Sequence, residues 1–152
     1  MNDSDYTILL VEDEENDAKL VQMAFKKNNI VNPVQWARDG LEAIAYLNGD
    51  GAYADRNQHP FPEVLILDLK MPRMGGLELL TWIREHPEFR VIPTIIMTSS
   101  RQHSEIEKAY NLGANTYMIK PSSFEELAKN VKLIHDYWAA SLKPVTKWPK
   151  RP

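Results

Sequence analysis

Five polar side chains that could share one reaction follow four apolar segments, each at the point where a segment ends. The apolar segments cover residues 8–11, 64–67, 95–97 and 117–119. The polar residues that follow them are Glu12 and Asp13, Asp68, Thr98, and Lys120. Short runs of branched apolar residues are typical of strands buried on both faces of a parallel sheet. Ligands bind at the carboxyl ends of such strands in open α/β sheets, so these side chains are expected to meet there.

The three acids of this set indicate a metal site. Clustered carboxylates repel one another, and a hard divalent cation such as Mg²⁺ relieves the repulsion and pairs with phosphoryl oxygens. A carboxylate beside such an ion can attack phosphorus and form an acyl phosphate. In this interpretation Asp13 is a metal ligand and Asp68 is the nucleophile. Thr98 donates a hydrogen bond to the phosphoryl group, and Lys120 neutralises its charge.

Strand-like and helix-like patterns alternate along the chain, as the positioning of these side chains requires. A further strand is expected at 33–37, and helices are expected at 15–28, 39–47, 76–86, 104–112 and from Ser122 or Ser123 onwards. The side chains expected on the buried face of the first helix are Leu20, Val21, Ala24 and Phe25. Residues 48–62 indicate a long polar loop. The (βα)5 order predicts a doubly wound α/β sandwich with parallel strands and right-handed crossovers.

Length and composition predict a single domain and fit a reducing compartment. The chain has 152 residues and no cysteine, which excludes disulfides and thiolate metal sites. Its net charge of −3, with both signs mixed along the sequence, argues against non-specific DNA binding. No apolar run approaches the ~20 residues that span a bilayer, and the polar start is unlike a signal peptide. We therefore expect a cytoplasmic location, with neither DNA nor a membrane as a partner.

The chain resembles the receiver domains of two-component response regulators over about residues 6–138. The matching motifs agree in order, spacing and strand context, and they are Val11-Glu12-Asp13, Asp68 with Met71-Pro72 and Gly76, Thr98-Ser99, and Tyr117 with Lys120-Pro121. The resemblance implies a flavodoxin-like sheet of five parallel strands in the order 2-1-3-4-5. It also implies that a sensor histidine kinase donates the phosphoryl group.

The resemblance also implies a ligand set and a type of activity. Asp13 and Asp68 would bind Mg²⁺ directly, and the backbone carbonyl of Lys70 would complete the protein ligands. Glu12 would act mainly through water. The protein would be a phosphoacceptor that assists its own phosphorylation and dephosphorylation, and not an enzyme with a separate substrate.

For the response to phosphorylation, the resemblance implies a two-residue switch. Thr98 and Lys120 would contact the phosphoryl group, and the peptide bond between Lys120 and Pro121 would be cis. Thr98 would move toward the phosphoryl group, and Tyr117 would turn inward into the vacated space. The alternative is that Tyr117 is an ordinary aromatic residue of the core.

Two features are similar to a narrower group, the stand-alone response regulators partnered with cyanobacterial phytochromes. The polar stretch 49–62 is longer than the usual connection into the third strand, and residues 139–152 extend the chain beyond a receiver domain at 1–138. We expect no separate output domain in this extension. The similarity implies a phytochrome-type kinase as partner. Signals would leave through the domain's own surface, to a downstream phosphotransfer protein or effector.

The end of the chain is richer in apolar residues than the core of one domain requires. These residues are Tyr137, Trp138, Leu142, Val145 and Trp148. Exposed aromatic residues are typical of protein interfaces. We expect a symmetric homodimer through this segment and the face of the fourth helix, fifth strand and fifth helix, which lies beside Tyr117 and Lys120. The alternative is that the segment folds back on its own domain.

Three other functions are compatible with part of this pattern. An aspartate-nucleophile phosphatase of the haloacid dehalogenase kind needs an acid two residues after the nucleophile, where this chain has Lys70. A flavodoxin-like electron carrier needs a phosphate-binding loop after the first strand, where residues 12–15 are all acidic and would repel the FMN phosphate. A receiver-like adaptor without phosphate turnover is the third alternative, and the complete set of site residues argues against it.

Overall fold

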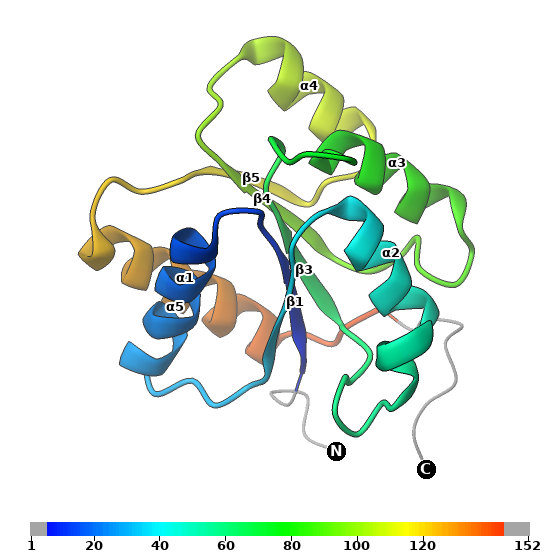
Figure 1. Ribbon diagram of the computed structural model, residues 1–152. Coiled ribbons are helices and arrows are strands. Elements are labelled where there is room, and N and C mark those ends of the chain that lie inside the picture. The colour runs from blue at the N-terminus through cyan, green and yellow to red at the C-terminus, as the bar shows by residue number, and fades with distance from the viewer. Residues whose placement is uncertain (1–5, 145–152) are drawn as a thin grey trace.

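The computed structural model describes residues 6–144, which contain a five-stranded parallel sheet (Figure 1). The strands are β1 Ile8–Val11, β2 Val34–Ala37, β3 Val64–Leu67, β4 Thr94–Thr98 and β5 Thr116–Ile119. They lie in the order β2-β1-β3-β4-β5. The register pairs Val11, the last residue of β1, with Ala37 on one side and Leu67 on the other. These three strands therefore end at one level, and the residues that follow them lie side by side.

Helices cover both faces of this sheet. The helices are α1 Glu15–Lys27, α2 Gly40–Asn48, α3 Gly76–Glu85, α4 His103–Asn111 and α5 Phe124–Ala140, with a short 3₁₀ helix, η1, at Gly51–Ala54. Helices α1 and α5 pack together on one face, and α2, α3 and α4 lie on the other (Figure 1). This is the doubly wound arrangement that the alternating sequence pattern predicts. Between residues 6 and 144, no helix is both long and apolar enough to cross a membrane.

The central strands are buried on both faces, which explains their uninterrupted apolar sequences. All residues of β1, β3 and β4 are buried. Successive side chains of a strand point to opposite faces, so Leu65 and Leu67 join the core under α2 to α4, whereas Val64 and Ile66 join the core under α1 and α5. Strand β5 lies at the edge of the sheet and is only partly buried.

Helix caps fix where two of the helices begin. The Asp39 carboxylate accepts a hydrogen bond from the Glu42 N–H at 2.9 Å, and the Ser123 hydroxyl accepts one from the Glu126 N–H at 3.2 Å. Each satisfies a backbone donor that the first turn of a helix leaves unpaired. The expected cap at Asp39 is confirmed, and Ser123 rather than Ser122 caps α5.

The expectation for Leu20 is wrong. This side chain is 40% exposed, whereas Ala18 and Val21 are buried. The residues of α1 that join the core are Ala18, Val21, Ala24 and Phe25, so its buried face is narrower than the apolar periodicity indicates. Leu20 lies at the edge of that face.

The segment 48–62 is more ordered than the expected loop. It contains η1, and the Arg56 guanidinium holds it to α2 by donating hydrogen bonds to the carbonyl oxygens of Leu47 at 2.9 Å and His59 at 3.3 Å. The Tyr46 hydroxyl also donates to the carbonyl of Pro60 at 2.8 Å. These bonds satisfy carbonyl groups that a loop would otherwise leave to water.

Candidate functional site

Asp68 follows the last residue of β3 and is only 6% exposed. Its Oδ1 accepts hydrogen bonds from the backbone N–H of Leu69 at 2.7 Å and of Lys70 at 3.5 Å. Its Oδ2 lies 3.0 Å from the ammonium nitrogen of Lys120. A buried carboxylate needs such partners, because desolvation of an unpaired charge is costly. The backbone thus orients one oxygen of Asp68, and the other faces a cation.

Two further acids lie beside Asp68, as the sequence predicts. Carboxylate oxygens of Glu12, Asp13 and Asp68 all lie within 4.8 Å of one another. Glu12 is 3% exposed, and its Oε1 accepts a hydrogen bond from the Glu14 N–H at 3.1 Å. Burial raises the pKa of the Glu12 carboxyl to about 7, and the hydrogen bond with Lys120 opposes this rise. The three carboxylates thus lie close enough to share one cation.

The ammonium of Lys120 joins three carboxylates. Its nitrogen lies 2.9 Å from Glu12 Oε2, 3.0 Å from Asp17 Oδ2 and 3.0 Å from Asp68 Oδ2. An ammonium has three N–H donors, so these three contacts can use all of them. Burial lowers the pKa of Lys120, but the hydrogen bonds to Glu12, Asp68 and Asp17 outweigh it and raise this pKa above its usual value. Lys120 is therefore a fixed positive charge in the site.

Thr98 and Tyr117 lie in the neighbouring strands. Thr98 ends β4 and is fully buried, and its carbonyl accepts a hydrogen bond from the Lys120 N–H at 2.8 Å. The Tyr117 hydroxyl donates to the carbonyl of Ser100 at 2.9 Å. Tyr117 is half-buried and packs against the core under α2 to α4. Thr98 is thus joined to Lys120, and the segment that follows Thr98 is joined to Tyr117.

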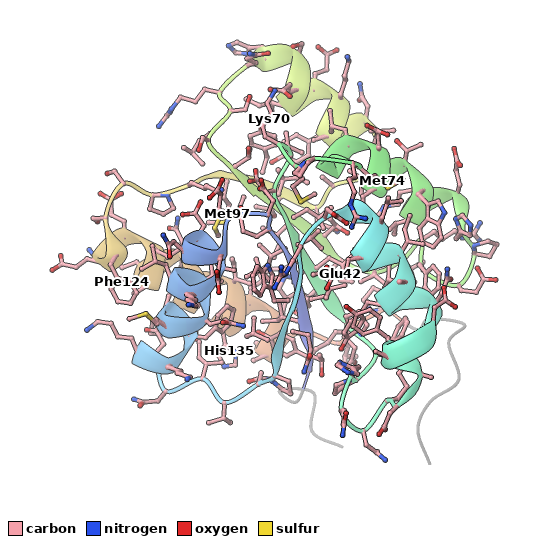
Figure 2. The ribbon with its side chains drawn as sticks, in the orientation of Figure 1. Glu42, Lys70, Met74, Met97, Phe124 and His135 are labelled. Carbon is pink, nitrogen blue, oxygen red and sulfur yellow. The ribbon has the colours of Figure 1, made fainter. Side chains whose placement is uncertain are left out.

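The connection from β3 to α3 packs tightly against Asp68. A Cβ atom at Gly76 would lie 2.2 Å from the Asp68 carbonyl oxygen, so only glycine fits there. The Gly76 N–H donates to the Leu69 carbonyl at 3.0 Å and closes the connection into a compact loop. Lys70 lies in this loop, and its exposed side chain is on the side of α4 (Figure 2). The role of the Lys70 carbonyl as a metal ligand stays a prediction.

The peptide bond between Lys120 and Pro121 is trans, as is every peptide bond from residue 6 to residue 144. The expected cis bond is therefore wrong. The preference for trans before proline is only ~0.5–1 kcal/mol, so surrounding contacts decide the isomer. With the trans bond, the Lys120 ammonium reaches Asp68.

Two acids of the site were not predicted from the sequence. Asp17 in the first turn of α1 binds Lys120. Glu105 in the first turn of α4 accepts a hydrogen bond from the Ser100 hydroxyl, and its Oε2 lies 3.3 Å from the Lys70 ammonium nitrogen. The hydrogen bond with Ser100 and the neighbouring Lys70 lower the pKa of Glu105. The available signal is position, because helix turns that directly follow strands face the same sheet edge as the strand ends.

Comparison with known proteins decides the family. Residues 8–132 match the model of the response regulator receiver domain, which is most of the chain. The chain belongs to this family. The identification made from the sequence is therefore confirmed, and so is the flavodoxin-like strand order 2-1-3-4-5.

Three proteins illustrate what this receiver domain is similar to in sequence and structure. Response regulator Rcp1 from Synechocystis sp. is 35% identical over 131 residues, which cover 86% of this chain and 87% of Rcp1. The probable methanogenesis regulatory protein FilR2 from Methanothrix harundinacea is 35% identical over 133 residues, which cover 88% of this chain and 83% of FilR2. The crystal structure of the phosphorylated cyanobacterial phytochrome response regulator RcpA has a TM-score of 0.84 at 32% identity, and the match covers 93% of this chain and 99% of that one.

The donor set of the receiver domain fits a hard divalent cation. Glu12, Asp13 and Asp68 offer carboxylate oxygens as ligands. Oxygen ligands suit Mg²⁺ or Mn²⁺ better than metals that prefer nitrogen or sulfur. A solved structure of Rcp1 is of its Mn²⁺-bound form, and it matches this chain with a TM-score of 0.81 at 33% identity over 92% of this chain and 99% of that one. A divalent metal site in this receiver domain is consistent with both observations.

Proposed function

We propose that Asp68 accepts a phosphoryl group from a sensor histidine kinase, and that the receiver domain then signals by a conformational change that alters partner binding. The observation that carries this proposal is the environment of Asp68. Its buried carboxylate lies beside Glu12 and Asp13 and 3.0 Å from the Lys120 ammonium, at the sheet edge where ligands bind. Such a group holds a nucleophile, acidic metal ligands and a cation in one place.

The residues around Asp68 support phosphoryl transfer directly. An Asp68 oxygen forms a bond to phosphorus, and the bond between phosphorus and the donor's histidine nitrogen breaks, with the electron pair staying on that nitrogen. The Leu69 N–H, 2.7 Å from Asp68 Oδ1, orients the carboxylate. Lys120 neutralises charge on the phosphoryl oxygens, and Thr98 donates a hydrogen bond to them.

Mg²⁺ is the cation that we propose for the acidic group. Asp13, Asp68 and the backbone carbonyl of Lys70 would hold it directly, and Glu12 would hold it through water. When bound, the ion would supply positive charge beside the phosphoryl oxygens. In this proposal the domain is a phosphoacceptor that assists its own phosphorylation and dephosphorylation, and not an enzyme with a separate substrate.

A phytochrome-type kinase is the phosphodonor that we propose. The similarity to the phytochrome response regulator RcpA, over 93% of this chain, supports this partner. A phosphotransfer profile tests it: autophosphorylated kinases, phytochrome-type and others, are mixed with the chain, and the loss of label from each kinase is timed. We expect the fastest transfer from a phytochrome-type kinase. Equal or faster transfer from unrelated kinases would leave the receiver function intact and exclude this partner.

We propose that the domain passes on its signal by binding a partner through its own surface. We propose residues 1–138 as the receiver domain and residues 139–152 as its extension, with α5 running into the extension as far as Ala140. The partner would be a downstream phosphotransfer protein or effector in the cytoplasm. The net charge of −3 supports a protein partner rather than DNA.

Replacement of Thr98 by alanine is predicted to uncouple switching from phosphorylation. A hydrogen bond from a hydroxyl to a charged acceptor contributes roughly 1.5–3 kcal/mol, so its loss changes the balance between two conformations about tenfold or more. NMR spectra recorded with Mg²⁺ and beryllofluoride, an acyl phosphate mimic, should show smaller shifts around Tyr117 in Thr98→Ala than in the unsubstituted chain. Thr81→Ala is the control, because the Thr81 hydroxyl donates within α3 to the Leu77 carbonyl. Full shifts in Thr98→Ala would contradict the switch.

A second copy of the chain is proposed to bind the face formed by β5 and α5. A groove of about 260 Å³ lies between these elements, and its lining residues are Ile95, Asn115, Thr116, Met118, Leu133, Ile134, Tyr137 and Trp138. Leu133 is 63% exposed and Tyr137 is 64% exposed, and exposed apolar groups of this size are typical of interfaces. Val145 and Trp148, which also led to the expectation of a homodimer, lie outside the described residues.

Replacement of Leu133 by glutamate is predicted to lower the dimer fraction, because a carboxylate in an apolar interface is desolvated without a partner. Analytical ultracentrifugation with and without acetyl phosphate measures this fraction. Val31→Glu is the matched control, since Val31 is 93% exposed in the connection between α1 and β2. An unsubstituted chain that stays monomeric at high concentration under both conditions would exclude the homodimer.

A further inference from the structure

Asp17 is the carboxylate of the site that the phosphoryl chemistry leaves without a role. Lys120 is held by three carboxylates at 2.9–3.0 Å. Two of them, Glu12 and Asp68, follow strands and lie in the proposed metal group. Asp17 comes from the first turn of α1, is not part of the metal group, and has a side chain that is 42% exposed.

The helix holds Asp17 in place beside Lys120. The next residue, Ala18, is fully buried, and Val21 one turn later is 6% exposed, so this part of α1 is anchored to the sheet. Helix α1 also packs along α5, the element that follows Lys120. The Asp17 carboxylate therefore has limited freedom to follow the ammonium if Lys120 moves.

The position of the Lys120 ammonium depends on these ion pairs more than on packing. A cavity of about 70 Å³ lies beside the side chain, and it is lined by Asp17, Asp68, Lys120 and apolar residues that include Leu10, Ile66 and Met97. A tightly packed side chain stays in place even if its polar contacts are lost. Here the space beside the stem of Lys120 allows the ammonium to shift when one of its carboxylate partners is lost.

This geometry sets up a competition for the Lys120 ammonium. Its three N–H donors can all be used by carboxylates before any phosphoryl group is present. To bind a phosphoryl oxygen, Lys120 has to give up or share one of these contacts. The Asp17 carboxylate also offsets the ammonium charge that a phosphoryl group would otherwise experience.

We propose that Asp17 is a positioning residue that restrains Lys120 and thereby slows the gain of a phosphoryl group by Asp68. The inference rests on the proposed function of Asp68 and adds a residue that sets its pace. Asp17 does not contact the reacting atoms and acts only through Lys120. A phosphoacceptor with this restraint responds less to small phosphodonors, which lack the contacts of a docked kinase.

Asp17→Asn tests the proposal, because asparagine keeps a hydrogen-bond acceptor of the same size and removes the charge. We expect initial labelling by acetyl phosphate at saturating Mg²⁺ to become about fivefold faster, the effect of a charge interaction of moderate strength. Glu15→Gln is the matched control. It makes the same change of charge in the same helical turn, where Glu15 is 63% exposed and pairs with Lys19 at 3.4 Å. Its rate should stay unchanged.

A double-substitution cycle shows whether Asp17 acts through Lys120. In a Lys120→Met background, Asp17→Asn should have no effect on the labelling rate. Binding of a phosphate mimic can be followed at equilibrium by the NMR signal of the Trp36 indole N–H, because this group donates to the Glu12 carbonyl at 2.7 Å. The signal is assigned by its loss in Trp36→Phe. Titration with beryllofluoride in Mg²⁺ should show tighter binding to Asp17→Asn than to the unsubstituted chain.

The outcomes separate the proposal from a structural role of Asp17. If Asp17 has a purely structural role in the first turn of α1, Asp17→Asn should have a lower melting temperature and an unchanged or lower labelling rate. An unchanged or lower labelling rate would therefore overturn the proposal. A gain that persists in Lys120→Met would overturn it as well. Asp17→Ser is a second variant with the same expected gain, should Asp17→Asn fold poorly. If the unsubstituted chain takes up no label, the proposed function fails together with the inference, whereas normal labelling without a gain in Asp17→Asn overturns the inference alone.

Discussion

Replacement of Asp68 by asparagine is expected to abolish labelling by acetyl phosphate and Mg²⁺, with a loss of ~10³-fold or more in rate. The amide oxygen is a much weaker nucleophile than a carboxylate, and it brings no full negative charge to the metal group. An amide oxygen still accepts the Leu69 N–H that now lies 2.7 Å from Oδ1, whereas the amide nitrogen cannot accept the bond that Lys120 donates to Oδ2. Intact-protein mass spectrometry and acid-stability of the label measure the result.

Two companion variants locate the cause of this loss. Asp50→Asn is the control, because Asp50 is exposed at the end of α2, away from the acidic group, and its labelling should be normal. Asp13→Asn should lower labelling by weakening the metal site, and higher Mg²⁺ concentrations should restore part of it, whereas they should not rescue Asp68→Asn. Undiminished acyl phosphate in Asp68→Asn would exclude Asp68 as the phosphoacceptor.

The strand ends could be predicted from the sequence because they follow from sheet geometry alone. Apolar runs such as 64–67 indicate buried parallel strands, and the carboxyl ends of parallel strands in one register lie at one edge of the sheet. Asp68, Thr98 and Lys120 are each the last residue of such a run or the residue after it. Their positions therefore depend on the backbone and not on details of packing.

Residues whose roles depend on side-chain packing could not be predicted. Asp17 lies in a helix turn that follows a strand, which indicates a place near the site. The helix dipole already explains an acid there, so the contact with Lys120 itself could not be predicted. Periodicity places Leu20 on the apolar side of α1 but does not specify where the buried face ends, and Leu20 is 40% exposed. The ordering of segment 48–62 depends on side-chain bonds to backbone carbonyl groups, made by Arg56 and Tyr46, which hydrophobic patterns do not indicate.

Gly76→Ala is expected to damage the site more than any other single-methyl addition in the connection from β3 to α3. The added Cβ would lie 2.2 Å from the Asp68 carbonyl oxygen and 2.9 Å from the Leu69 Cα. Both are backbone atoms, so relief requires a shift of the segment that carries Asp68. Overpacking of this kind costs about 3 kcal/mol of unfolding free energy or more. Urea denaturation without Mg²⁺ measures this cost.

The same shift should reduce labelling even in the molecules that stay folded, because it moves Asp68 and Lys70 relative to Asp13. Gly75→Ala is the matched control, since its Cβ would meet only the Leu69 carbonyl oxygen, at 3.0 Å. We expect Gly75→Ala to be milder in both stability and labelling. If the two variants lose the same stability, or if folded Gly76→Ala is labelled at the normal rate, the close approach at Gly76 does not position Asp68. A selective loss of labelling in folded Gly76→Ala would mean that the glycine is needed for the geometry of the acidic group as well as for the fold.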